Sequence, residues 1–430
     1  MSINKFCNLA KKTLFPICRS ITGNGIKETL KIIRKEFPKL KICKIKCGTK
    51  VFDWKIPDEW NIKDAYVIDN RKEKIIDFKK NNLHLINYST PISKKINRDD
   101  LLKKISTLPK KPNAIPYLTS YYEKKWGFCT THNQKKYLFK KYKKKDQFNV
   151  VIKSKFNNKG HLNYGELLLP GQSKQEILIS TYICHPSMAN NELSGPIVSM
   201  ALIKYFMKKK LNKTMRFIFI PETIGSLAYL SKKLKILKKN VIGGFNLTCI
   251  GDDRNHSCML SRNENSQSDK AIIQCYKKLK IKHKIFSYLE RGSDERQFNS
   301  PYIDLGITSI FRTKYGEYPE YHTSLDSFGH VVTKRGLNGG FKVAKKSIEI
   351  LQKKIIPKSM IVCEPQFGRR GFFKKLSIEK KKKQVRDLIN FMTFSDGTND
   401  LEDISKKLRI SYNKSKFYLN ILLKHNLIFC

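Results

Sequence analysis

The stretch 176–186, EILISTYICHP, decides the fold of this 430-residue chain. Its continuous apolar run is typical of a strand covered on both faces. The amphipathic pattern of a helix follows at 195–209, GPIVSMALIKYFMKK. Strand, helix and strand patterns then recur at MRFIFIPETIG (215–225), SLAYLSKKL (226–234) and NVIGGFNLTCIGDD (240–253). This alternation predicts an α/β fold with a mostly parallel sheet flanked by helices.

The predicted strands end in polar side chains. His185, Glu222 and Asp252 each stand just after an apolar strand pattern. Ligand sites of open α/β sheets lie at the carboxyl ends of the strands, so this coincidence predicts an active site. Imidazole is the commonest zinc ligand, and burial raises the pKa of a carboxyl such as Glu222 toward that of a general base. Taken singly, His185 also fits a structural role, and Glu222 also fits a helix-start carboxylate.

Changes in the predicted secondary structure along the chain divide it into three units. Residues 1–44 and 116–356 are predicted to form the α/β domain, and the short strands and turns of 45–115 a small β-rich insert. Residues 357–430 contain three helical patterns with a tight second-to-third turn, which predicts a winged-helix-like domain with little or no wing. The aromatic stretch 120–128, SYYEKKWGF, fits core packing better than it fits a stacking platform for a sugar or peptide.

Composition narrows the class of protein. No apolar run approaches the roughly 20 residues that a membrane span needs, and the first residues show no secretory pattern. The eleven cysteines are scattered rather than arranged as a disulfide framework, so we expect reduced thiols and a cytoplasmic location. The net charge of +50 comes from lysines spread over the whole length. Compositional drift explains that spread better than a dedicated nucleic-acid surface does.

Several phrases occur together in the order of a known family. They include CHPSMANNELSGP (184–196), PETIGS (221–226), GSDERQF (292–298), KYGEYPEYHTSLD (314–326) and EPQFGRRG (364–371). On these phrases the chain resembles the aminopeptidase-like proteins of polysaccharide-biosynthesis loci, which join a zinc aminopeptidase-like domain to a winged helix. The resemblance covers nearly the whole chain and implies a zinc-exopeptidase-like fold.

The resemblance also implies roles for individual residues. His185 and His322 would be zinc ligands, and Glu222 the general base. Asn191 stands where the aminopeptidases place an aspartate that bridges two metals, and Glu295 stands near the substrate. Asp252, or the adjacent Asp253, would substitute for a metal-binding aspartate.

The chain departs from the family pattern at three of these positions. Asn191, Thr223 and Thr248 replace carboxylates, and neutral side chains are poor zinc ligands. A full two-metal site is therefore doubtful, whereas one zinc held by two histidines and a carboxylate remains chemically sufficient. In a second arrangement, Glu222 is itself a ligand and Glu295 is the base.

Three functions follow from the sequence. The leading prediction is a zinc-dependent amide hydrolase that binds one or two zinc ions and acts on a peptide or an N-acylated amino sugar. The alternatives are a metal-poor pseudo-enzyme that serves as a binding module, and a regulator that binds nucleic acid through the winged helix. No membrane partner is expected, and self-association stays open.

Overall fold

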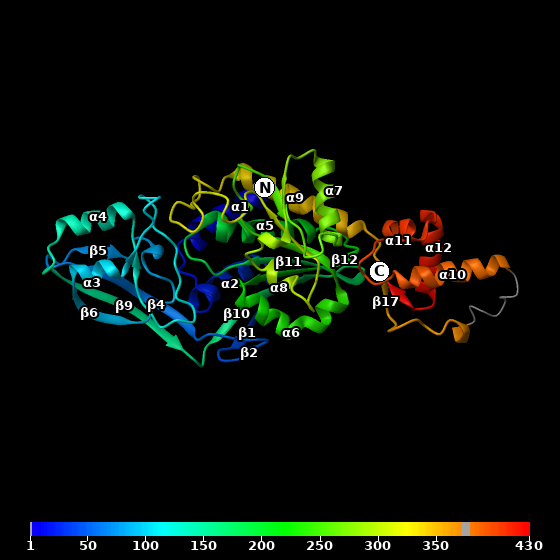
Figure 1. Ribbon diagram of the computed structural model, residues 1–430, viewed down its shortest axis with the longest axis horizontal. Helices are drawn as coiled ribbons and strands as arrows, with labels where there is room; N and C mark the ends of the chain where they lie inside the picture. The colour runs from blue at the N-terminus through cyan, green and yellow to red at the C-terminus, as the bar shows by residue number, and fades with distance from the viewer. Residues whose placement is uncertain (1, 371–378) are drawn as a thin grey trace.

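The computed structural model describes residues 2–370 and 379–430. Its centre is a mixed eight-stranded sheet in the order β1-β10-β12-β11-β13-β16-β14-β15 (Figure 1). The four middle strands β12, β11, β13 and β16 run parallel, and antiparallel pairings join the edges to them. The bounds are β1 Lys41–Lys46, β10 His161–Leu169, β11 Ser173–Tyr182, β12 Lys213–Ile220, β13 Val241–Leu247, β14 Ser257–Met259, β15 Lys284–Phe286 and β16 Ile307–Phe311.

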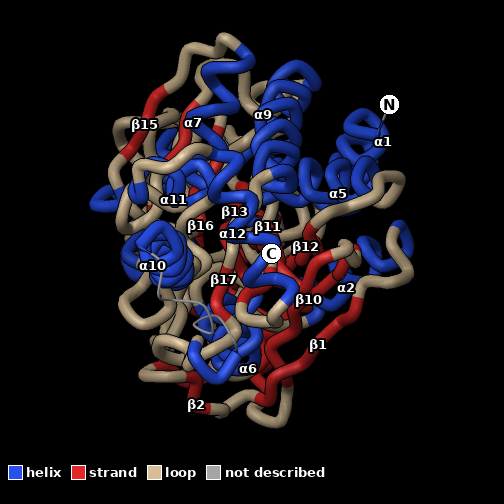
Figure 2. The backbone as a smooth tube through the Cα atoms, turned by 90° about the vertical axis from the view of Figure 1, so that its right-hand side faces the viewer, coloured by secondary structure: helices blue, strands red, loops and turns tan. Residues whose placement is uncertain are grey.

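Helices cover both faces of this sheet. On one face α5 packs on β11 and β13, and α1, α9 and α7 pack beside it. On the other face α6 packs against β10, β11 and β13, with α8 next to it (Figures 1 and 2). Helix α2 packs on β10. The bounds are α1 Ser2–Leu9, α2 Asn24–Glu36, α5 Ser194–Phe206, α6 Ile224–Asn240, α7 Gln267–Leu279, α8 Glu295–Phe298 and α9 Lys334–Lys353.

This double cover explains the sequence of the central strands. The side chains from Gln175 to Pro186 are buried without alternation, because a strand between two helical layers has no solvent face. Strand β13 carries Gly243 and Gly244, and a Cβ at Gly244 would lie 2.0 Å from the carbonyl oxygen of Leu178 on β11. The close approach of these two strands thus requires a residue without a side chain.

A second, four-stranded sheet forms the insert, in the order β5-β4-β9-β6. Its main elements are β4 Glu59–Ile68, β5 Lys74–Asp77, β6 Ile92–Asn97, α3 Arg98–Lys103, α4 His132–Lys141 and β9 Gln147–Asn157. The shorter elements are β2 Lys50–Val51, β3 Trp54–Lys55, η2 Asn82–His84, β7 Ile105–Ser106 and β8 Phe128–Cys129.

The predicted boundaries of the insert, 45–115, end it too early. Strand β9, at 147–157, belongs to the small sheet and pairs with both β4 and β6. Its alternating burial fits a sheet that is covered on one face, and the chain reaches the main sheet only beyond Gly160. The sequence marks this return with a turn rather than with a change of composition, which is why the boundary was misplaced.

The last part of the chain forms a separate small core of three helices. Helices α10 Glu379–Thr393, α11 Leu401–Leu408 and α12 Tyr412–Lys424 pack around Phe391, Ile404 and Leu422. Strand β18 Ile428–Phe429 pairs with β17 Lys358–Ser359 from the connecting segment, in place of a wing hairpin. Figure 2 shows this bundle in front of the main domain. No described helix is both long and apolar enough to span a bilayer.

Candidate functional site

The register of the two central strands brings His185 and Glu222 together. Tyr182 at the end of β11 lies opposite Ile220 at the end of β12, and both functional residues follow within three positions. The backbone N–H of Glu222 donates to Cys184 Sγ at 3.2 Å. Glu222 Oε2 then lies 3.7 Å from His185 Nε2. The expected meeting of side chains at the carboxyl ends of parallel strands is thus observed for this pair.

The other ring nitrogen of His185 is held by a buried ion pair. Glu192 Oε2 lies 3.0 Å from His185 Nδ1, and Glu192 Oε1 accepts from Arg19 Nε at 3.1 Å. The side chains of Glu192 and Arg19 are both fully buried. Arg19 Nε also donates to the backbone carbonyl of His185 at 2.9 Å. This network fixes the orientation of the imidazole and leaves Nε2 free to bind.

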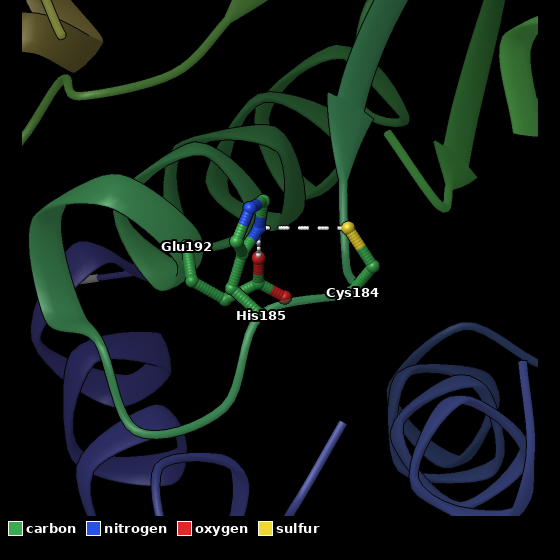
Figure 3. A group of neighbouring side chains, drawn as sticks. All are labelled: Cys184, His185 and Glu192. Atoms are coloured by element: carbon green, nitrogen blue, oxygen red, sulfur yellow. Dashed lines mark hydrogen bonds and ion pairs between the residues drawn. The ribbon is translucent and has the colours of Figure 1, made fainter. Parts of the chain in front are cut away.

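Cys184 completes a group of possible metal ligands around that same Nδ1 atom. The ligand atoms of Cys184, His185 and Glu192 lie within 4.8 Å of one another (Figure 3). Burial raises the pKa of the Cys184 thiol to about 11, so it stays protonated. Glu192 is already neutralised by Arg19, whose guanidinium would repel a cation there. We therefore assign this group to the support of His185, and place the metal-binding side at Nε2.

His322 supplies a second imidazole close to His185. Its ring centroid lies 5.6 Å from that of His185, and Tyr117 lies 5.2 Å from each ring. Tyr321 stacks on His322 at 3.9 Å. Burial and His185 lower the pKa of His322 to about 3, so its ring is neutral and suited to bind a metal. His322 Nε2 is buried and has no hydrogen-bond partner.

Asn191 also carries an unpartnered polar atom. Its Oδ1 is buried without a hydrogen bond, while its Nδ2 donates to Tyr182 Oη at 2.7 Å. Tyr182 Oη lies 2.5 Å from Thr248 Oγ1. Asn191 and Thr248, two positions where the family resemblance implies carboxylates, are thus uncharged and joined through Tyr182, and neutral side chains are poor ligands for a second metal.

Glu222 is the carboxyl group best placed for proton transfer. Burial raises its pKa, and the opposing effect of His185 and of Ser293 is smaller. Ser293 Oγ donates to Glu222 Oε1 at 2.6 Å, which leaves Oε2 facing His185 Nε2. The Glu222 side chain keeps 23% of its surface exposed, so a water molecule can reach it. These are the properties of a general base.

Glu295 was predicted as an alternative base, and the structure gives it a different role. It is fully buried, and its Oε1 accepts from the N–H groups of Gly292 and Ser293 and from Tyr315. Its Oε2 accepts from Asn246 and Ser309. With all acceptor positions used, Glu295 holds the loop that carries Ser293 rather than taking protons from a substrate.

Asp252 does not join the two histidines either. Both of its oxygens accept hydrogen bonds, from the backbone of Arg254, the backbone and side chain of Thr313, and Asn190 Nδ2. Asp253, its predicted substitute, accepts from Thr333 and Arg335. Strand β13 ends before these residues, so the chain turns away from the site before it reaches them.

Sequence reasoning missed three residues that organise the site. Arg19 comes from the N-terminal segment, and Glu192 from the π-helical turn η3 (Ala189–Leu193). Asp326 accepts from the backbone N–H groups of Asn190 and Asn191 at 2.6 and 2.8 Å and so fixes that turn. Glu192 and Asp326 lie inside phrases on which the family resemblance rests, but nothing in their spacing shows that they organise the site.

His185 and His322 are the candidate imidazole ligands for one zinc ion, with ring centroids 5.6 Å apart. The His322 ring is neutral and its Nε2 has no hydrogen-bond partner, whereas against the opposing effect of burial Cys184 and Glu192 raise the pKa of His185, whose Nε2 faces Glu222 Oε2 at 3.7 Å. Among the described residues, Cys184, His185 and Glu192 are the one group of three potential ligand residues whose ligand atoms all lie within 4.8 Å of one another. Buried polar atoms without partners are rare in folded proteins, and His322 Nε2 and Asn191 Oδ1 are two such atoms. Glu295, Asp252 and Asp326 accept hydrogen bonds from other groups, whereas the buried Asp294 keeps Oδ2 without a partner, and burial and the nearby Glu222 raise its pKa to about 8.

Two family models, a curated relative and solved structures match this chain over most of its length. Residues 8–354 match the model of a family described as a domain of unknown function, DUF4910, and residues 355–430 match that of winged helix-turn-helix domains. A curated Clostridium acetobutylicum protein is 39% identical over 422 residues, which cover 96% of this chain and 94% of that protein. It is named as a polysaccharide biosynthesis protein with an aminopeptidase-like domain.

Solved structures agree on the fold. A candidate peptidase from Clostridium acetobutylicum is 38% identical, with a TM-score of 0.79 and coverage of 100% of this chain and 97% of its own. The zinc aminopeptidase BSAP from Bacillus subtilis is 14% identical, with a TM-score of 0.59 and coverage of 81% and 93%. The predicted aminopeptidase-like α/β fold and C-terminal winged helix are therefore confirmed.

Proposed function

Since this chain belongs to the DUF4910 family, and its fold is that of the aminopeptidases, we propose that it is a zinc-dependent amide hydrolase. The observation that carries the proposal is the convergence of His185, His322 and Glu222 at the strand ends. His322 Nε2 has no hydrogen-bond partner there, and Glu222, whose pKa burial raises, lies 3.7 Å from His185 Nε2.

In this proposal His185 and His322 hold one zinc, with Asn191 Oδ1 as a weak third donor. A zinc ion bound there would supply Lewis acidity to the scissile carbonyl and to the attacking water. Glu222 Oε2 takes the proton of that water and delivers it to the departing amine, while Ser293 keeps Oε1 in place. Arg19 and Glu192 hold His185 in the tautomer that leaves Nε2 unprotonated.

The substrate is an amide, and its setting is the assembly of a polysaccharide. The Clostridium acetobutylicum relative is named for polysaccharide biosynthesis, and N-acylated amino sugars are amides that such a setting supplies. A peptide amide remains the second substrate class to be tested, because the fold is shared with aminopeptidases.

A specific observation also supports a second candidate, a binding module without hydrolytic activity. Asn191, Thr223 and Thr248 stand where the family resemblance implies metal-binding carboxylates, and Tyr182 forms hydrogen bonds with both Asn191 and Thr248. A protein of this kind would keep the fold and bind its ligand without turnover.

Zinc content and turnover together test the proposal. We expect about one zinc per chain in protein purified without chelators, its loss in His185→Ala and in His322→Ala, and its retention in the exposed control His330→Ala. Zinc-loaded wild type should release amine from a panel of peptide amides and N-acetylated sugars, and Glu222→Gln should keep its zinc but lose turnover. A folded wild type that takes up no added zinc overturns the metallohydrolase. Zinc binding without turnover of any amide favours the binding module.

A further inference from the structure

Three exposed aromatic side chains lie on two segments, the β2–β3 hairpin and the segment that follows Tyr117. Phe52 and Trp54 come from the β2–β3 hairpin, and Tyr122 from the segment that follows Tyr121. They are 45%, 39% and 55% exposed. The Trp54 and Tyr122 rings meet edge to face with centroids 5.9 Å apart. Figure 1 shows β2 at the edge of the main domain, near α6 and the junction with the insert.

Two of these aromatics are presented by an unfavourable backbone. Phe52 has φ of 56° and Tyr122 has φ of 65°, which is the left-handed region that bulky residues avoid. A turn that only reversed the chain would use Gly or Asn at such positions. Strained residues persist where they serve a purpose, and here the strain places large apolar rings in solvent.

The aromatic cluster is connected to the candidate site through its neighbours. Tyr121, adjacent to Tyr122, has its hydroxyl 3.0 Å from that of Tyr117. Tyr117 in turn lies against the rings of His185 and His322. The segment is anchored across the site, because the backbone N–H of Tyr117 donates to His322 O at 2.9 Å. One short segment thus carries both a wall of the candidate site and part of the exposed cluster.

The surroundings of the cluster favour a saccharide over a protein partner. The exposed residues next to the rings are polar or charged: Lys50, Asp53, Lys55, Glu123, Lys124 and Lys125. A stable protein interface buries about 800 Å² on each side around an apolar centre, and three rings with a polar border fall short of that. Sugar rings have an apolar C–H face that packs on an aromatic ring, and hydroxyl groups that hydrogen-bond a polar border.

We propose that Phe52, Trp54 and Tyr122 form a binding platform for a saccharide chain. Tyr122 belongs to the same segment as Tyr117, which borders His185 and His322, so that one end of a chain held on the platform can extend toward the candidate site. Binding to the platform is independent of catalysis; only its use in presenting a substrate rests on the proposed function.

Binding of defined oligosaccharides tests this proposal on the full chain. Chitohexaose and cellohexaose serve as probes, one with and one without N-acetyl groups, and calorimetry measures their affinity. We expect saturable binding of at least one of them, weakened about tenfold or more in Trp54→Ala and in Tyr122→Ala. Tyr137→Ala removes an aromatic ring of similar exposure from α4 of the insert, and it should bind as the wild type does. In the wild type, the emission of Trp54 should change on binding, because the chain has only three tryptophans and Trp60 is buried.

The outcomes separate this proposal from the proposed function. Glu222→Gln should bind the probes normally, so binding without turnover supports the platform even if the hydrolase fails. Absence of binding by a folded wild type, or equal affinity in Trp54→Ala, overturns the platform. A concentration-dependent dimer that Trp54→Ala abolishes would assign the surface to a second copy of the chain and overturn it as well.

Discussion

Replacement of Glu192 by Gln tests the buried network that orients His185. Glu192 uses a different oxygen for each partner: Oε1 accepts from Arg19, and Oε2 from His185 Nδ1. Gln has the same shape but only one oxygen, so its NH2 group must face one of the two donors. Arg19 loses its counter-ion in either orientation, because Gln carries no charge, and one of the two donors also loses its acceptor.

Two magnitudes follow from this geometry. Both side chains of the Arg19–Glu192 pair are fully buried, and leaving one buried charge without its partner costs about 3–5 kcal/mol of the free energy of unfolding. Loss of the carboxylate that orients a metal-binding histidine typically weakens metal affinity by about 10- to 100-fold. We expect Glu192→Gln to show both effects, and the second only if zinc binds His185 Nε2.

Urea unfolding of the chelator-treated protein measures the first effect, and competition with a zinc chelator under native conditions measures the second. Glu166→Gln is the matched control, because Glu166 is also buried and paired with an arginine, Arg216, away from the histidines. Arg216 keeps Glu176 as a second partner, so this control should lose less stability and no zinc affinity. A folded Glu192→Gln protein that binds zinc as tightly as the wild type would refute the orienting role.

Three further changes test other parts of the structure. Burial raises the pKa of Asp326 to about 6 from 3.8, so the folded state keeps this proton at a pH where the unfolded state has lost it. The metal-free protein should therefore lose about 2 kcal/mol of its free energy of unfolding as pH rises from 4 to 6, and urea titrations should show a flatter pH profile for Asp326→Asn. Glu295→Gln should lower the urea midpoint by the equivalent of about 2–4 kcal/mol, since buried donors lose their acceptor. Glu222→Gln should instead unfold close to the wild type and lose turnover. The reverse pattern would identify Glu295 as the base. Lys354→Met removes a largely buried ion pair with Asp400 and should speed proteolysis between the main domain and the winged helix. An unchanged cleavage rate would show that this ion pair does not hold the two domains together.

The sequence was sufficient for the architecture because the central strands have no solvent face. Uninterrupted apolar runs at β11, β12 and β13, alternating with amphipathic helices, admit few arrangements other than a helix-covered parallel core. The insert was harder to delimit, because β9 reaches its partners only after the long excursion from β6, and pairing between distant segments leaves no local signal. The sequence also does not show whether a polar residue is buried. Glu295 would look the same in sequence whether it faced a substrate or, as in the structure, five hydrogen-bond donors.

The candidate site shows where residue-by-residue transfer from a family stops being safe. Asn191, Thr223 and Thr248 look like separate losses in sequence, but in the structure Asn191 and Thr248 both bond to Tyr182 and so form one neutral unit. A carboxylate restored at 191 alone would sit against the Tyr182 hydroxyl and the sulfur of Cys249 instead of opposite a second acidic ligand. His322 Nε2, in contrast, has no hydrogen-bond partner, and His185 keeps the support of Glu192 and Arg19. A group of neutral side chains that hydrogen-bond one another at expected ligand positions is therefore a more specific indication of a one-metal site than the absence of any single ligand.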